Sequence, residues 1–209
     1  MQAITALMMM ATATQSISHE KDFRSREWTD LIRGGLVPYH QLTLNDFRIA
    51  ERGRGDSEAF TLGFIRYRFE PSVTGTTAIT ASVAKLRVWS GLDRNSTWRR
   101  PWLDARHPFV AHEQHHLDIN ELAAYRFANT PANQLPTGTG ENRDQALRDL
   151  AKKVDTYFQT ILRDSQRQHD LYDRETRGGT DEAAQRRWSN ATTNALRASG
   201  IRPLWTLDR

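Results

Sequence analysis

The sequence predicts an α+β fold in which a mainly antiparallel sheet is followed by helices. Three observations lead to this prediction. Between residues 42 and 89, two runs are rich in β-branched and aromatic residues, as strands are. After Pro101 the apolar residues recur at helical spacing instead. Strands that come first along the chain, with helices after them, are typical of α+β domains.

The length of 209 residues fits one domain, and six tryptophans and eight phenylalanines supply large core side chains. We expect residues 1–18 to be an export signal or a disordered N-terminus, and residues 19–209 to form a single domain. An apolar stretch at residues 3–11 precedes Ala11-Thr12-Ala13, which has the small-x-small form of a signal-peptidase site. This predicts a secreted or periplasmic protein, and the alternative is an amphipathic N-terminal helix. No apolar run reaches the roughly 18 residues that span a bilayer.

Charge and cysteine content exclude several classes of function. The net charge is +4, but arginines are scattered among acids and no basic block exceeds two residues. Nucleic-acid binders usually gather their charge in a patch, so we expect no nucleic-acid partner. The chain has no cysteine, which excludes disulfides, cysteine-bound metal and thiol nucleophiles.

The first part of the chain is expected to hold a short helix and a hairpin. Residues 27–33 are predicted to form a short helix that ends at Gly34-Gly35, a strong breaker pair. Residues 60–69 and 78–89 are predicted strands. The residues between them, from Glu70 to Gly75, contain Pro and Gly and predict the turn of a hairpin or meander.

The second part is expected to be helical. Residues 109–128 contain no Gly or Pro and suit one helix of about five turns. Residues 130–140, with two prolines and two glycines, predict a loop. An apolar stripe over residues 144–172 predicts a long helix that Gly178-Gly179 breaks. Thr180 is the expected N-cap of a last helix, which ends near residue 198.

The residues that carry chemistry lie in the first long helix, which reads Ala111-His112-Glu113-Gln114-His115-His116. His112 and His116 are four residues apart, so they project from one face of the helix and can bind one metal ion. Zinc fits best, because imidazole nitrogens suit it and its tetrahedral site leaves one position for water. Glu113 can then act as the general base on that water. By chance, such a motif arises on the order of 0.01 times in a chain of this composition.

The neighbouring polar residues of this helix point elsewhere. His115 is rotated by about 100° from His116, so both cannot face the same ion. Asp118 and Glu121 are rotated from His116 by about 160° and 140°. We interpret these two acids as groups that support the metal ligands from behind or as surface groups, which could also orient neighbouring elements. The third metal ligand must therefore come from another segment.

The motif and three other stretches resemble the bacterial predicted secreted zinc proteases, a family filed as a domain of unknown function. His112-Glu113-Gln114-x-His116-x-Asp118-Ile119-x-Glu121 looks like its signature, and Asn95-Ser96-Thr97-Trp98 looks like its Ser-Trp element. Leu42-Thr43-Leu44-Asn45-Asp46-Phe47 is similar to its early element, with Leu44 in place of Trp. Tyr172-Asp173-x-x-Thr176-x-x-Gly179, followed by Gln185-x-x-Trp188, is similar to its last element. The resemblance covers about residues 27–190 and implies a zincin-like fold and a zinc-dependent peptidase with a peptide or protein substrate.

The resemblance also guides the choice of the remaining site residues. Asp173 belongs to the matched Tyr-Asp element and is the favoured third ligand, with His169 and Glu175 as alternatives. Tyr172 is expected either to donate a hydrogen bond to the oxyanion or to pack in the core. Gly178 stands where the family usually has His, so the alternative function is a catalytically impaired zincin-like module that binds a peptide or protein partner. A structural histidine–metal site in a nucleic-acid-binding protein is disfavoured, because the charge is not clustered.

Overall fold

The computed structural model describes residues 33–51, 58–104 and 108–200. The expected export signal or disordered segment at residues 1–18 lies outside the described residues, as does the expected helix at 27–33 apart from Arg33. The described part confirms the α+β class, with antiparallel strands and three α-helices. None of its helices is long and apolar enough to cross a membrane.

A long antiparallel hairpin forms the main sheet. Its strands are β4 (Gly63–Thr74) and β5 (Ile79–Asp93), which pair along nearly their whole length. On the other edge of β5, β1 (Leu36–Pro38) pairs near one end and β7 (Thr137–Gly140) near the opposite end. A smaller sheet has the order β2 (Arg48–Ile49), β6 (Trp98–Arg99), β3 (Ala59–Phe60). Its β2–β6 pair is the one parallel pair among the described strands.

The predicted hairpin turn lies later in the chain than expected. β4 continues through Pro71 to Thr74, and the register shifts between Glu70 and Pro71. Proline cannot donate to the ladder, and this irregularity accommodates it without ending the strand. The chain turns instead at Gly75, whose φ of +96° favours glycine.

The predicted loop at residues 130–140 was wrong in part, because it contains a short 3₁₀ helix (Ala132–Gln134) and strand β7. The two glycines that suggested a loop allow a close contact instead. A Cβ atom on Gly138 would lie 2.2 Å from the carbonyl oxygen of Ala146 and 2.3 Å from the amide nitrogen of Leu150. Glycine therefore lets the following helix lie against this strand.

The helices are α3 (Phe109–Ala128), α4 (Arg143–Thr176) and α5 (Glu182–Ala198). The predicted bounds of α3 are confirmed. The N-cap of α5 is Asp181 rather than Thr180, because the Asp181 carboxylate accepts a hydrogen bond from Ala184 N at 2.9 Å. The Thr180 hydroxyl instead donates to the carbonyl of Arg177.

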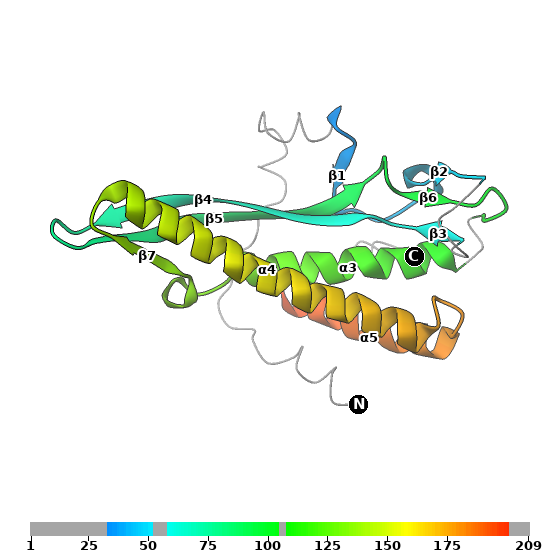
Figure 1. The fold of residues 1–209 in the computed structure, drawn as a ribbon. Coiled ribbons are helices and arrows are strands. Elements are labelled where there is room, and N and C mark those ends of the chain that lie inside the picture. The colour runs from blue at the N-terminus through cyan, green and yellow to red at the C-terminus, as the bar shows by residue number, and fades with distance from the viewer. Residues whose placement is uncertain (1–32, 52–57, 105–107, 201–209) are drawn as a thin grey trace.

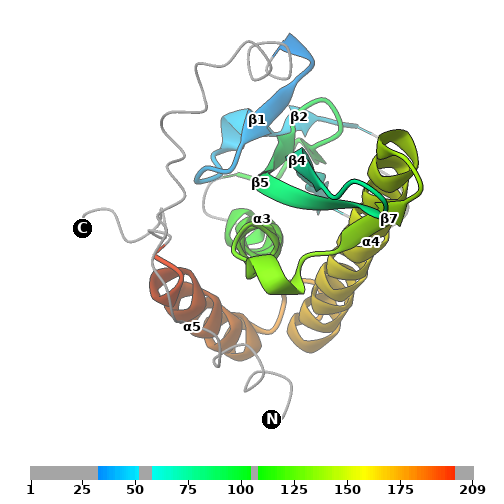
Figure 2. The same cartoon turned by 90° about the vertical axis from the view of Figure 1, so that its left-hand side faces the viewer.

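Helix α3 is the centre of the fold. Figure 1 shows the hairpin lying over α3 and α4, and the end-on view in Figure 2 shows α3 beneath the sheet with α4 and α5 on its two sides. The largest apolar cluster joins the hairpin to α3 and α4, and includes Ile65, Val88, Phe127, Leu150 and Phe158. A second cluster joins the first half of α3 to β5 and to the segment between β1 and β2, and includes Leu42, Phe47, Leu92, Phe109 and Leu117. Because α3 is packed on several sides, its polar face is held in a defined position.

Candidate metal centre

His112, His116 and Asp173 converge into one cluster of potential metal ligands. The two histidines lie one turn apart on α3, and Asp173 lies near the end of α4. Asp173 Oδ1 is 3.1 Å from His112 Nε2 and 3.1 Å from His116 Nε2. The three potential ligand atoms lie within 4.8 Å of one another, and this is the one such group found among the described residues. The cluster could hold a metal ion.

The chemistry of these donors fits zinc. Two imidazole nitrogens and one carboxylate oxygen are a ligand set that catalytic zinc sites use, with a fourth position left for water. Bonds of about 2.0–2.1 Å in a tetrahedron place neighbouring ligand atoms about 3.3 Å apart. The observed 3.1 Å separations between Asp173 Oδ1 and each Nε2 atom are close to this value. The two contacts of Asp173 are therefore compatible with one shared zinc ion.

Asp173 gives the cluster its negative charge and its access to solvent. Its side chain is 52% exposed, whereas that of His112 is 8% exposed, so water can reach the cluster from the α4 side. Partial burial acts to raise the pKa of Asp173, but hydrogen bonds from both histidines and their charges outweigh it and hold that pKa well below its usual range. Asp173 therefore stays ionised, which is the form that binds a metal.

The two alternative ligands are engaged elsewhere. His169 Nδ1 lies 2.9 Å from His116 Nδ1, the ring nitrogen opposite the one that faces Asp173. Burial, followed by the nearby His116, lowers the pKa of His169 to about 4, so this ring is neutral. Glu175 accepts a hydrogen bond from Trp188 Nε1 at 2.8 Å. Neither residue belongs to the cluster.

Glu113 lies next to the cluster on α3 and is buried. Its charge acts on His112, whose pKa is raised because the hydrogen bond with Asp173 and the nearby Glu113 outweigh the opposing effect of burial. Among the described side chains, none makes a hydrogen bond or ion pair with the Glu113 carboxylate in this structure. A carboxylate in this position can accept a proton from a water molecule at the cluster.

Tyr172 lies beneath the histidines rather than in an open position. Its ring stacks on His112, with centroids 4.7 Å apart, and on His115 at 5.2 Å. The side chain is fully buried, and its hydroxyl donates to Gln185 Oε1 at 3.0 Å. Of the two expected roles, these contacts favour packing, because an oxyanion donor would have to leave this hydrogen bond.

Gln185 is a site residue whose role the sequence did not indicate. Its Oε1 atom lies 3.0 Å from His112 Nδ1, and it also accepts the Tyr172 hydroxyl. The sequence offered one signal: Gln185 and Trp188 are three residues apart, so they lie on one face of a helix. In the structure, Trp188 contacts Tyr172 edge-on. That spacing indicates a buried face but says nothing of which residue of α3 the amide would meet.

The turn between α4 and α5 lies directly against His112. Gly179 has a φ of +91°, and a Cβ atom there would lie 3.1 Å from Cγ and Nδ1 of His112. Gly178, which stands where the resembled family has His, has a φ of +62° and nothing within 4 Å of a Cβ atom. Gly178 therefore has open space around it, whereas Gly179 lets the turn contact His112, a potential ligand.

The acids that follow the motif are buried and tie α3 to the strands. Asp118 accepts hydrogen bonds from the Tyr39 hydroxyl at 2.7 Å and from Gln114 Nε2 at 2.9 Å. Glu121 accepts a hydrogen bond from the Ser90 hydroxyl. The expected surface position of Asp118 and Glu121 was wrong, because both side chains are buried. Their contacts with neighbouring elements fit the orienting role, and neither residue joins the cluster.

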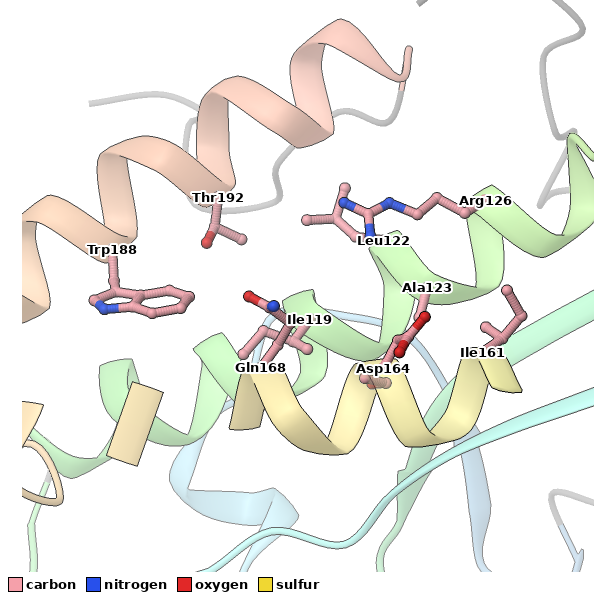
Figure 3. Close-up of a pocket in the computed structure, with 10 residues that line it drawn as sticks. Ile119, Leu122, Ala123, Arg126, Ile161, Asp164, Gln168, Trp188 and Thr192 are labelled. Atoms are coloured by element: carbon pink, nitrogen blue, oxygen red, sulfur yellow. The ribbon is translucent and has the colours of Figure 1, made fainter. Parts of the chain in front are cut away.

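A cavity of about 130 Å³ lies between α3, α4 and α5. Figure 3 shows Trp188 and Thr192 of α5 facing Ile119 of α3 and Gln168 of α4 across it. None of the three cluster residues lines this cavity. The cavity is therefore separate from the candidate metal centre. Ser165 lines the cavity and also donates a hydrogen bond to Asn120, which contacts His169.

No protein-family model, curated protein or solved structure matches this chain. The comparisons thus add no family to the resemblance seen in the sequence. The function that follows rests on the residues of the cluster and on their surroundings.

Proposed function

We propose that this protein is a zinc-dependent hydrolase that cleaves amide bonds in peptides or proteins. The observation that carries this proposal is the convergence of His112, His116 and Asp173, with Glu113 beside them. Two helices supply the three ligands, and the partly exposed Asp173 leaves the cluster open to water and substrate. The resemblance to bacterial secreted zinc proteases supports the same function and an exported location.

In the proposed reaction, His112, His116 and Asp173 would hold the zinc ion. A bound zinc ion would polarise the scissile carbonyl and lower the pKa of its water to about 7. The Glu113 carboxylate would accept a proton from the water that attacks the carbonyl carbon, and would then deliver it to the leaving nitrogen. The carbon–nitrogen bond breaks, and the products are a carboxylate and an amine. Gln185 contacts the Nδ1 atom of His112, and Tyr172 stacks on the face of its ring.

The test separates metal binding from chemistry. Glu113→Gln keeps the size of the side chain but cannot accept a proton, so zinc should stay bound while hydrolysis of a denatured protein substrate falls roughly 100-fold or more. Glu141→Gln is the matched control, since Glu141 is exposed and lies outside the cluster. His112→Ala and His116→Ala should each abolish stoichiometric zinc. Hydrolysis by Glu113→Gln at the parent rate would refute the role of Glu113.

The second candidate is a catalytically impaired module that binds a peptide or protein partner. Gly178, in place of the His of the resembled family, is the observation that favours it. Zinc bound at one ion per chain, with no cleavage of any member of a peptide library but retention of particular peptides, would support this function over the hydrolase.

A further inference from the structure

Each of the two histidines in the cluster has a second ring nitrogen, and a polar side chain contacts each one. His112 Nδ1 lies 3.0 Å from Gln185 Oε1, while its Nε2 faces Asp173. An amide oxygen can only accept, so this hydrogen bond requires the proton of a neutral His112 to be on Nδ1. The Tyr172 hydroxyl donates to the same oxygen at 3.0 Å. Loss of the Nε2 proton that is shared with Asp173 then leaves the Nε2 lone pair for a metal ion.

The support of His116 is a chain of three side chains. His169 Nε2 lies 3.1 Å from Asn120 Oδ1, which also accepts a hydrogen bond from the Ser165 hydroxyl at 3.1 Å. An oxygen acceptor at this position places the His169 proton on Nε2, so its Nδ1 carries a lone pair. That lone pair faces His116 Nδ1 at 2.9 Å. His116 must therefore donate from Nδ1, and its Nε2, which contacts Asp173, is the nitrogen left to bind a metal ion.

We infer that Gln185 and His169 are positioning residues that hold both histidine ligands with the proton on Nδ1, so that each presents Nε2 to the metal. This inference rests on the metal site of the proposed function. Groups that orient metal-bound histidines in this way commonly strengthen metal binding about 10–100-fold. The inference also makes His169, which the sequence offered as an alternative ligand, a support for His116 instead.

The helices that carry these residues make the arrangement possible. His169 and Asp173 are four residues apart on α4, so one face of this helix supplies both a ligand and the support of His116. Gln185 lies at the end of the first turn of α5, the helix that follows the glycine turn touching His112. The supports thus come from two helices that pack on either side of α3.

The first measurement is ¹⁵N–¹H NMR of the zinc-loaded parent chain with ¹⁵N-labelled histidine. We expect protonated Nδ1 and metal-bound Nε2 for both His112 and His116. Metal bound through Nδ1 of either residue would overturn the inference. This measurement needs no variant, so it decides the question even where a substitution prevents folding.

The second measurement is zinc affinity by competition with a chelator. Gln185→Leu removes the acceptor and should weaken binding about 10–100-fold, whereas Gln185→Glu keeps an acceptor oxygen and should stay within about threefold of the parent. Gln159→Leu, at an exposed position of α4, is the matched control and should change nothing. Equal affinities for the two leucine variants would overturn the role of Gln185.

His169→Phe keeps a ring of similar shape without an acceptor nitrogen, and should also weaken zinc binding about 10–100-fold. Complete loss of zinc, as expected for His116→Ala, would instead make His169 a ligand and overturn its assigned role. Absence of zinc from the parent chain would overturn both this inference and the proposed function. Absence of hydrolysis, with the expected affinities and NMR signals intact, would overturn the hydrolase function alone.

Discussion

Substituting each glycine of the Gly178-Gly179 pair by alanine tests whether the α4–α5 turn is built to touch a metal ligand. Both residues have positive φ, of +62° and +91°. A left-handed backbone costs an L-residue about 1–2 kcal/mol, so both variants should lose stability. For a chain of this size that corresponds to a fall in Tm of about 2–8 °C. Because both variants carry this cost of a left-handed backbone, each one controls for the loss of stability in the other.

The two variants should differ in zinc binding. The new Cβ of Gly179→Ala would lie 3.1 Å from Cγ and Nδ1 of His112, so the ring must move by a few tenths of an ångström. The ring has little freedom to move, because Gln185 holds Nδ1 and Tyr172 stacks on its face. The metal-binding Nε2 atom is then displaced, although ligand distances tolerate only about 0.2 Å. We expect zinc affinity to fall about tenfold or more, or about 1.4 kcal/mol.

Gly178→Ala should bind zinc within about threefold of the parent, because a Cβ atom there meets nothing within 4 Å. Zinc affinity is measured by chelator competition, and Tm by circular dichroism of the zinc-free chains. Equal zinc affinities for the two variants would refute the steric argument. A large loss of zinc affinity in Gly178→Ala, with no loss in Gly179→Ala, would contradict the steric argument outright.

Three further predictions concern other parts of the molecule. Asp173→Ala should weaken zinc binding far more than Asp170→Ala, an exposed control on the same helix, and a structure with zinc held by His112, His116 and His169 would refute this. Gly178→His should keep zinc affinity within about threefold and leave hydrolysis unchanged or raised, because His is one of the residues that tolerate positive φ; a loss of zinc would contradict this. Hydrogen bonds from His40, Arg94 and Thr43 outweigh burial and hold the pKa of Asp46 well below its usual range, so its stabilising effect is present above about pH 4 and lost as the pH falls through that lowered pKa. The difference in unfolding free energy between the parent and Asp46→Asn, from urea titrations, should therefore shrink on acidification, and a difference that is constant from about pH 6 to 2 would exclude this role.

Local patterns determined much of the fold. Helix α3 has the predicted bounds, because no Gly or Pro interrupts residues 109–128. The hairpin strands were predicted, but their turn was placed too early and strand β7 was missed, because its residues were predicted to form a loop. In both cases glycine or proline suggested a break where the tertiary structure uses them in a strand. Whether Gly138 lies in a loop or against a helix depends on a contact with Leu150, which no local pattern contains.

The candidate site divides in the same way. The sequence by itself determined that His112 and His116 share a helix face with Glu113 beside them, since spacing along a helix sets direction. Asp173 was selected among three candidates only through a resemblance, because 61 residues separate it from His112 and the packing of α4 decides where its carboxylate lies. The contacts of Gln185 and His169 with the second ring nitrogens were decided by the tertiary structure alone. Those contacts depend on how three helices pack, and helix packing is set by side chains distant in the sequence.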